Sequence, residues 1–272
     1  MATGSHSELF RLLDISSEDA HDCAELLATP PDSEVVQALD ALKARLGSFP
    51  RDGITDGNAS EASWIEALLR FAPSVHAYHL ELGISPVVSA ASLADVGLQL
   101  RINRRVHGRF GLDTWGWLTL HMAGNLFRLG RLQFHLVPAD VSVSASGWAL
   151  GVHIPEDGGL SPALVDESFA EARSFFPRHF PDKPAAVATC DSWMLDPYLS
   201  ERLPNSNIAS FARRFTLDGC TDAQSDAVYF TFRQRGLQDL EKLPRDTSLQ
   251  RVVLERIDDG GTWQLGHGHL EL

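Results

Sequence analysis

A strand, a glycine-containing loop and a helix start follow one another in residues 148–162, which read WALGVHIPEDGGLSP, and this unit decides the fold. The apolar residues up to Pro155 predict a strand. Glu156–Leu160 then form a loop, and Ser161 stands where a helix N-cap is expected, with Pro162 at the first helical position. Glycines let the backbone approach a ligand closely, and the free N–H groups of a helix start attract phosphate or carboxylate. The unit is therefore either an anion site or a plain tight turn.

The loop itself carries acidic residues, whereas a stretch before it in the chain is rich in arginine, and the two favour different ligands. Glu156 and Asp157 argue against a phosphate ligand because two carboxylates repel a pyrophosphate, but they are suited to orient an amine or to accept its proton. Residues 101–131, in contrast, carry six arginines and a single acid, Asp113. That basic stretch can bind an anionic ligand, or it can form salt bridges to the acidic first hundred residues.

Strand-like patterning begins near Leu126 and continues to the C-terminus. Further strands are predicted over Arg131–Val137, Ala185–Thr189, Phe215–Leu217, Ala227–Phe232 and Thr262–Leu272. Helices are predicted from Ser161 to about Phe176, near Pro197–Leu203 and Ile208–Arg213, and over Thr247–Ile257. The order β-β-α-β-α-β-β predicts a mixed α/β fold whose sheet is largely antiparallel, with one central crossover.

The first half of the chain is patterned for helices. Apolar residues recur every three or four positions in Val35–Leu46 and again in Ser60–Phe71. A further helix is expected over Trp115–Met122, where the aromatic residues favour a place in the core over an acyl-chain site. We predict a helical N-terminal domain at residues 1–125 and a second domain at residues 126–272.

Composition narrows the function classes. At 44% hydrophobic and 22% charged over 272 residues, the chain has the composition of an ordinary globular protein. The net charge of −13 makes nucleic acid and anionic membranes poor partners, and no apolar stretch approaches the roughly 18 residues of a membrane helix. Three widely separated cysteines indicate neither a disulfide framework nor a structural zinc site. Without a secretion signal, we expect a cytoplasmic protein that needs no metal.

A second group of reactive side chains stands at residues 190–193 (CDSW), where a predicted strand ends. In open α/β sheets, the C-terminal ends of the strands line the ligand crevice. Cys190 is either a nucleophile activated by His153 or a small buried apolar residue. Ser192 either donates a proton to a leaving group or caps the next helix.

Five segments, in this order along the chain, resemble one protein family. They are Phe127–Phe134 (FRLGRLQF), Leu150–Gly158 (LGVHIPEDG), Cys190–Pro197 (CDSWMLDP), Leu203–Ile208 (LPNSNI) and Arg213–Phe215 (RRF). The chain resembles the bacterial acyltransferase-domain proteins, in which a helical N-terminal (NAT_N-like) domain precedes a GNAT-like C-terminal domain. The resemblance covers Ser92–Leu272 well and the earlier residues loosely.

The resemblance implies a GNAT-like sheet flanked by helices and transfer of an acyl group from a thioester, acyl-CoA, to an amine. In such a fold two central strands diverge and the acyl-pantetheine inserts between them, and the matching strands here are Trp148–Ile154 and Ala185–Thr189. The usual Q/R-x-x-G-x-G/A loop is missing, which leaves a carrier-protein thioester as an alternative donor. Family members commonly have histidine where this chain has Asp191, so a general base there is altered.

The implied chemistry needs few groups. A carboxylate or histidine takes the proton of the amine, backbone N–H groups polarise the thioester carbonyl, and a hydroxyl or thiol protonates the departing thiolate. The expected catalytic residues are His153, Glu156, Asp157, Cys190, Asp191 and Ser192. The expected coenzyme-binding residues are Val152, Ile154, Gly158, Gly159, Leu160 and Ser161.

Three functions remain open at this point. The first is an N-acyltransferase that acts by direct transfer on a small-molecule amine, with acyl-CoA or an acyl carrier protein as donor. The second is a thiol enzyme in which Cys190 is acylated and His153 is its base. The third is a non-catalytic binding or regulatory module that kept the fold, which the acid pair Glu156–Asp157 favours.

Overall fold

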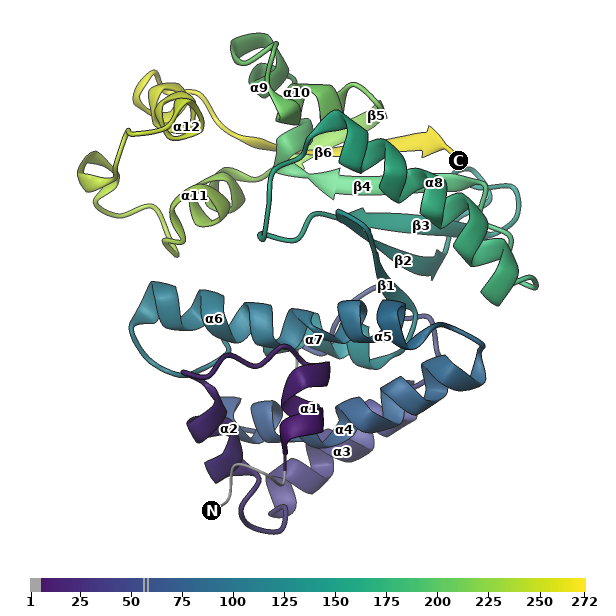
Figure 1. Cartoon of the computed structure of the whole chain (residues 1–272). Coiled ribbons are helices and arrows are strands. Elements are labelled where there is room, and N and C mark those ends of the chain that lie inside the picture. Colours follow the sequence, from purple (N-terminus) through teal and green to yellow (C-terminus); the bar gives the residue numbers. More distant parts are fainter. Residues whose placement is uncertain (1–5, 56, 58) are drawn as a thin grey trace.

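The computed structural model describes residues 6–55, 57 and 59–272 and consists of two layers that follow the order of the chain (Figure 1). The first layer is made of helices α1–α7, and the second is a six-stranded sheet flanked by helices. In Figure 1 the helical layer lies below the sheet, and strand β1 lies next to the helices.

The helices of the first layer are α1 (Ser7–Leu12), α2 (Ala20–Leu26), α3 (Ser33–Arg45), α4 (Glu61–Glu81), α5 (Pro86–Leu93), α6 (Asp95–His107) and α7 (Trp115–Met122). Local sequence explains where several begin. Asp32 accepts a hydrogen bond from the Val35 N–H at the start of α3, and Ser60 caps α4 in the same way. Helix α4 lies at the centre of this layer, since Leu68 and Leu69 are fully buried. The helical first layer is as predicted.

The strands β1 (Leu126–Leu129), β2 (Leu132–Pro138), β3 (Trp148–His153), β4 (Val187–Ser192), β5 (Thr216–Asp222) and β6 (Gln264–Glu271) form one sheet in the order β1-β2-β3-β4-β6-β5. Every neighbouring pair is antiparallel except β3 and β4, which are parallel. Helix α8 (Pro162–His179) connects these two strands. The predicted mixed, mostly antiparallel sheet with one central crossover is confirmed.

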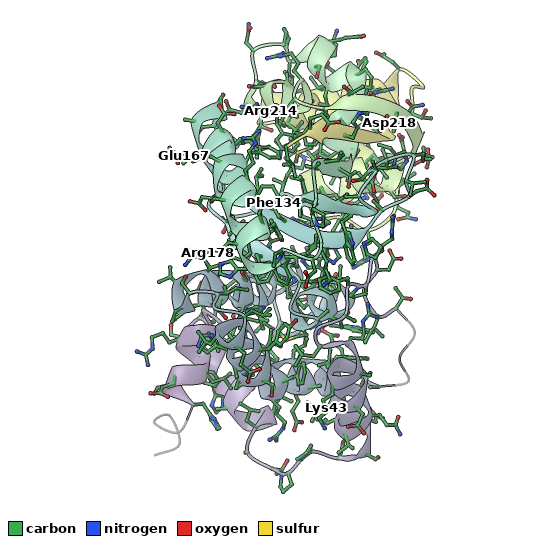
Figure 2. The ribbon with its side chains drawn as sticks, turned by 90° about the vertical axis from the view of Figure 1, so that its right-hand side faces the viewer. Lys43, Phe134, Glu167, Arg178, Arg214 and Asp218 are labelled. Atoms are coloured by element: carbon green, nitrogen blue, oxygen red, sulfur yellow. The ribbon has the colours of Figure 1, made fainter. Side chains whose placement is uncertain are left out.

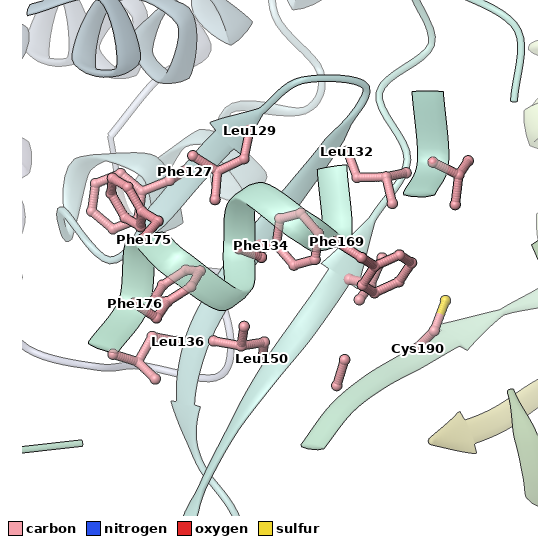
Figure 3. Packing of buried hydrophobic residues seen from close by; sticks show 14 of the residues in the cluster. Phe127, Leu129, Leu132, Phe134, Leu136, Leu150, Phe169, Phe175, Phe176 and Cys190 are labelled. Atoms are coloured by element: carbon pink, nitrogen blue, oxygen red, sulfur yellow. The ribbon is translucent and has the colours of Figure 1, made fainter. Parts of the chain in front are cut away.

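Helix α8 covers one face of the sheet and closes its core. Figure 3 shows Phe169 and Phe176 of α8 beside Phe134 of β2, whose ring centroid lies 5.5 Å from that of Phe169. Burying each of these phenylalanines contributes roughly 2–3 kcal/mol. In the side view of Figure 2, Phe134 lies next to α8, while Glu167 and Arg178 lie on its outer side. The face of the sheet opposite α8 is left for the helical layer and for a functional site.

The segment Ala227–Phe232, predicted as a strand, is instead part of helix α11 (Gln224–Phe232). Its alternating apolar residues suit a strand, but a short apolar run does not distinguish strand from helix. Packing decides, because the consecutive residues Ala227 and Val228 are both fully buried in one cluster with α12 (Ser248–Asp258). Consecutive residues point to opposite faces of a strand, whereas both can lie on the buried side of a helix.

The remaining helical segments are the 3-10 turns Trp193–Leu195 and Leu240–Lys242, α9 (Pro197–Arg202) and α10 (Asn207–Ala212). Strand β5 continues well beyond the predicted Phe215–Leu217 and forms an edge of the sheet with all its residues exposed. In the part of the chain that the structure describes, no helix is both long and apolar enough to cross a bilayer.

Candidate active site

A cavity of about 770 Å³ lies where strands β3 and β4 diverge. The two strands pair only at Leu150–Ala188 and Gly151–Thr189, although β3 continues to His153 and β4 to Ser192. Beyond the second pair their facing backbone edges do not hydrogen-bond to each other, and both edges line the cavity. A narrow ligand can therefore enter between the two strands and meet backbone donors and acceptors.

Most of the predicted site residues line this cavity. They are Val152, His153, Ile154, Glu156, Gly158, Gly159, Leu160, Cys190, Asp191 and Ser192. Asp157 and Ser161 are not among the lining residues. Ser161 occupies the N-cap position of α8, as predicted, but its side chain makes no capping hydrogen bond.

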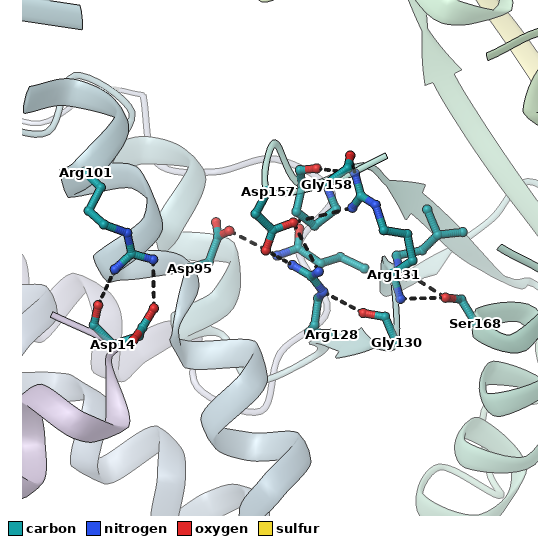
Figure 4. Close-up of polar contacts among 12 residues, drawn as sticks. Asp14, Asp95, Arg101, Arg128, Gly130, Arg131, Asp157, Gly158 and Ser168 are labelled. Carbon is teal, nitrogen blue, oxygen red and sulfur yellow. Dashed lines mark hydrogen bonds and ion pairs between the residues drawn. The ribbon is translucent and has the colours of Figure 1, made fainter. Parts of the chain in front are cut away.

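The glycine loop is held by one buried arginine, Arg131, from the turn between β1 and β2 (Figure 4). Its Nη2 donates to the carbonyls of Pro155 (2.7 Å) and Gly158 (2.6 Å), and its Nε donates to the Gly159 carbonyl (3.0 Å). The side chain is 6% exposed, and burial lowers its pKa against the opposing effect of Asp157. Because three loop carbonyls turn toward one guanidinium, the loop has a fixed shape at the cavity wall.

The two acids of the loop are neutralised by arginines. Asp157 accepts from Arg128 at 2.8 and 3.2 Å and lies 3.6 Å from Arg131 Nη1. Burial raises the pKa of Asp157, but the hydrogen bond and charge of Arg128 outweigh burial and hold this pKa below its usual value. Glu156 is ion-paired with Arg105 of α6 and with Arg233, which follows α11.

Around the loop, four arginines therefore face two carboxylates. The repulsion of a phosphate that Glu156 and Asp157 imply in the sequence is removed, because the surroundings carry an excess of positive charge. Arg105, Arg128 and Arg131 all come from the basic stretch at residues 101–131. Those three arginines form salt bridges to the loop acids. The other three of the stretch, Arg101, Arg104 and Arg109, pair with acids of the first hundred residues, as one of the two expectations had it.

Cys190 and His153 do not form an activated thiol pair. Cys190 is 2% exposed in the core between the sheet and α8, and burial, with a smaller effect of Asp191, raises its thiol pKa. Burial lowers the pKa of His153 to about 4, with a further effect of His121. The Nε2 of His153 is buried without a hydrogen-bond partner, and its ring packs edge-on against Trp117 at 4.7 Å. A buried thiol that stays protonated is a poor nucleophile.

Asp191 and Ser192 stand at the end of β4. The Asp191 carboxylate lines the cavity, and its Oδ1 lies 2.8 Å from Nδ1 of His267 on β6. Ser192 Oγ accepts a hydrogen bond from the Met194 N–H at 3.1 Å, so Ser192 caps the following 3-10 turn. Among the carboxylates singled out in the sequence, Asp191 is the one at the cavity that no arginine holds in the described structure.

The helical layer supplies a wall of the cavity that the sequence does not reveal. Asp95, which is 4% exposed, accepts from Trp117 Nε1 at 3.0 Å and from Gln133 Nε2 at 3.2 Å. All three residues line the cavity. Trp117, one of the aromatic residues of α7 predicted to belong to the core, packs against the core of the helical layer and also lines the cavity. Helix α11 adds Tyr229 to the same cavity.

No group of three or more His, Cys, Asp or Glu residues in the described ranges is arranged to hold a metal ion. The cavity lining supplies backbone edges, a loop flanked by arginines, and the carboxylates of Asp191 and Asp226, neither of which pairs with an arginine in the described residues.

Comparisons with known proteins agree with this geometry. Residues 5–124 match the model of an N-acyltransferase N-terminal domain, and residues 126–270 match that of a GNAT-like C-terminal domain. An acyltransferase mutant (orf11*-W163A) crystallised with octanoyl-CoA is 32% identical, with a TM-score of 0.89 over 99% of this chain and 88% of that one. An acyltransferase in complex with CoA and 10C-teicoplanin is 33% identical, with a TM-score of 0.86 over 97% of this chain and 87% of that one. An acyltransferase in complex with decanoyl-CoA and teicoplanin is 33% identical, with a TM-score of 0.86 over 99% of this chain and 88% of that one. No curated protein matches significantly.

Proposed function

The chain belongs to the acyltransferase family that joins an N-acyltransferase N-terminal domain to a GNAT-like C-terminal domain, and from this premise we propose that it acylates a small-molecule amine by direct transfer from acyl-CoA. Family membership is confirmed over both halves of the chain, and with it an acyltransferase that uses acyl-CoA as co-substrate. The amine acceptor, the direct mechanism and the role of each residue are the proposal.

The donor is held by the unpaired edges of β3 and β4 and by the glycine loop. Pantetheine binds between the two strands as an added strand, and the backbone N–H groups at Val152–Ile154 polarise the thioester carbonyl. The diphosphate binds at Gly158–Leu160, next to the start of α8, where a helix N-terminus and the excess of arginine charge favour an anion. Two observations support this donor site. Strands β3 and β4 pair at only two positions, which leaves their facing edges open, and Arg131 holds the loop through hydrogen bonds to three of its carbonyls.

Transfer forms an N–C bond and breaks the C–S bond of the thioester. The amine must first lose its proton, and Asp191 is the acceptor for it, because it lines the cavity without an arginine partner, whereas Glu156 and Asp157 are held by arginines and Nε2 of His153 is buried. Ser192, whose hydroxyl proton is free to donate while its oxygen caps a turn, protonates the departing thiolate. Asp191 and Ser192 are adjacent on β4, so both proton transfers take place at one end of the strand.

The acceptor enters from the side of the helical layer. Trp117 and Tyr229 give this side aromatic surface, and Asp191 and Asp226 give it negative charge for a cationic amine. Related structures hold teicoplanin or 10C-teicoplanin together with CoA or decanoyl-CoA, which supports a small-molecule acceptor here. The three cysteines are free, which supports a reducing, cytoplasmic setting. A carrier-protein donor is the alternative to acyl-CoA.

Calorimetry against free CoA, acetyl-CoA, octanoyl-CoA and decanoyl-CoA tests the donor site. We expect micromolar binding by the unmodified protein and a loss of at least about 100-fold in Gly159→Phe, since a bulky group there fills the phosphate site. A Cβ at Gly159 meets no atom within 4 Å, so the fold tolerates the change. Gly219→Phe is the matched control, because Gly219 also has open space but lies on the edge strand β5.

Two outcomes decide against the proposal. If the unmodified protein binds none of the CoA species, the proposed donor site is wrong. If binding is equal in both glycine variants, the diphosphate lies elsewhere. A screen of amines by mass spectrometry then identifies the acceptor through the added acyl mass. The non-catalytic module loses its main support, because the acid pair that favoured it is neutralised.

A further inference from the structure

One of the buried carboxylates in the part of the chain that the structure describes has no cationic partner. The other buried carboxylates each lie 2.6 or 2.7 Å from an arginine nitrogen, in the pairs Asp19–Arg104, Glu66–Arg70 and Asp196–Arg256. Asp95, which is 4% exposed at the start of α6, pairs with no arginine or lysine of the described residues. It is also the buried carboxylate that lines the cavity. Burying a charge without a countercharge is costly, so the position favours a cation supplied by a ligand.

The groups that contact Asp95 are neutral. The Oδ2 of Asp95 accepts from Trp117 Nε1 at 3.0 Å, and Oδ1 accepts from Gln133 Nε2 at 3.2 Å (Figure 4). His121 Nε2 lies 3.5 Å from Oδ2, but burial lowers the pKa of His121 against the opposing effect of Asp95. His121 is therefore uncharged at neutral pH. Two neutral donors and the start of α6 stabilise the carboxylate, but they do not cancel its charge.

The lining of the cavity suits an organic cation at this position. The arginines among the lining residues, Arg131 and Arg233, are engaged with the glycine loop and its Glu156. The indole of Trp117 lines the cavity beside Asp95, and Phe230 of α11 lines it while 49% exposed. Aromatic faces attract ammonium groups, so this lining favours an organic ammonium group over an anion.

We propose that Asp95 binds a second, non-reacting ammonium group of the acceptor, an inference that rests on the proposed function and narrows its acceptors to amines with at least two cationic groups. An ammonium group next to a buried carboxylate stays protonated, because the opposite charge favours its charged form. Such a group cannot attack the thioester, since attack needs a neutral amine. Asp95 therefore holds one end of the acceptor, and Asp191 takes the proton of the amine at the other end.

The test compares linear diamines, from putrescine and cadaverine to octamethylenediamine, with the amino alcohols of the same lengths. Each pair differs only in whether the second end carries a positive charge. In steady-state acylation from octanoyl-CoA, we expect kcat/KM of the best diamine to exceed that of its amino alcohol about 10- to 100-fold, because the second charge gains a desolvated partner.

Asp95→Asn should remove this preference, since asparagine keeps the shape and can still accept from Trp117 but has no charge. We expect a higher KM for the diamine, with KM for octanoyl-CoA and turnover of the amino alcohol unchanged. Asp14→Asn is the matched control, because Asp14 pairs with Arg101 of the same helix, is 63% exposed and does not line the cavity.

Equal kcat/KM for diamine and amino alcohol at every length overturns the second-cation site and leaves the acyltransferase intact. This comparison needs no variant, so it decides even if Asp95→Asn does not fold. Equal losses for both acceptors in a folded Asp95→Asn also overturn the site, because Asp95 then acts on the reacting amine. If octanoyl-CoA binds but no amine is acylated, the proposed function fails. Calorimetry of the diamines against the CoA-bound protein then tests the site separately, and binding that Asp95→Asn does not weaken overturns it.

Discussion

Arg131 shows how much of the site depends on one side chain. Its planar guanidinium donates three hydrogen bonds to carbonyls of a loop that lies 24 to 28 residues further along the chain. Its backbone N–H and that of Leu132 donate to Ser168 Oγ of α8. One residue therefore joins the β1–β2 turn, the glycine loop and the crossover helix. An ammonium group is a compact charge without the fork geometry of a guanidinium, so lysine cannot replace it.

Arg131→Lys is expected to weaken acyl-CoA binding about 10- to 100-fold, because each lost charge-assisted hydrogen bond is worth about 1.5–3 kcal/mol. Calorimetry measures the loss, and urea unfolding should give a lower free energy of unfolding. Arg235→Lys is the control, since Arg235 pairs with Asp113 on the surface and does not line the cavity. Unchanged acyl-CoA affinity in Arg131→Lys would show that the loop does not bind the donor.

Cys190→Ala is expected to keep acyl transfer within about 2-fold and to lose about 1–2 kcal/mol of stability, because the thiol is a packed apolar group. Iodoacetamide should label the exposed Cys220 and leave turnover unchanged, since burial raises the pKa of Cys190. Peptide mass mapping locates the label. Inactivation that coincides with label on Cys190 would restore the thiol-enzyme hypothesis.

At the scale of elements, α11 (Gln224–Phe232) is where local pattern and packing disagree. A strand over these residues would have turned alternate side chains to opposite faces of the sheet. As a helix, the segment buries Ala227 and Val228 against α12 and presents Tyr229 to the cavity. Because the segment was predicted as a strand, Arg233, which follows the helix and pairs with Glu156, was missed as well.

Val228→Ala is expected to cost about 1–2 kcal/mol of unfolding free energy, because Val228 is fully buried. Phe230→Ala should change stability by less than about 0.5 kcal/mol, since Phe230 is 49% exposed. Because Phe230 lines the cavity, its loss should raise KM for the acceptor instead. Urea unfolding and steady-state kinetics separate the two effects. A strand would give similar stability losses at both positions, which lie two residues apart.

At the scale of the whole molecule, the helical layer and the sheet meet through buried neutral histidines. His79 of α4 packs against Phe127 of β1 at 5.0 Å, and His153 of β3 packs against Trp117 of α7. His135 of β2 is buried beside His153. Burial lowers the pKa of His79 and His153 to about 4 and that of His135 to about 3, and neighbouring histidines add to the effect.

Stability is therefore expected to fall on mild acidification. Each of these pKa values lies below the ordinary 6.5 of the unfolded chain, so above pH 6.5 both states are neutral. As the pH falls toward 4, the unfolded state binds protons that the folded state does not, and each histidine removes up to about 3 kcal/mol. The midpoints of urea unfolding, measured between about pH 7.5 and 4.5, give the slope of stability against pH. His135→Gln should flatten it, and an unchanged slope would mean that His135 titrates normally in the folded protein.

Much of the architecture follows from local sequence. Helix caps such as Asp32 and Ser60, the 3–4 residue spacing in the first half and the strand–loop–helix unit at residues 148–162 act between residues close in the chain. These local signals predict the helical layer, the places of most strands along the chain and one central crossover, and the resemblance to a known family adds the position of the divergent pair. The resemblance to an acyltransferase family rests on the same local motifs and is confirmed.

Only the tertiary structure decides which groups meet in the cavity. The arginines that neutralise Glu156 and Asp157, the wall formed by Asp95 and Trp117, and the pairing of Asp191 with His267 all join residues far apart in sequence. Charge, burial and pKa depend on distances in space, and no periodicity or spacing along the chain records which distant segments will approach one another. The motifs thus predict where the site lies, and the packing of the two layers decides which of its groups are free to act.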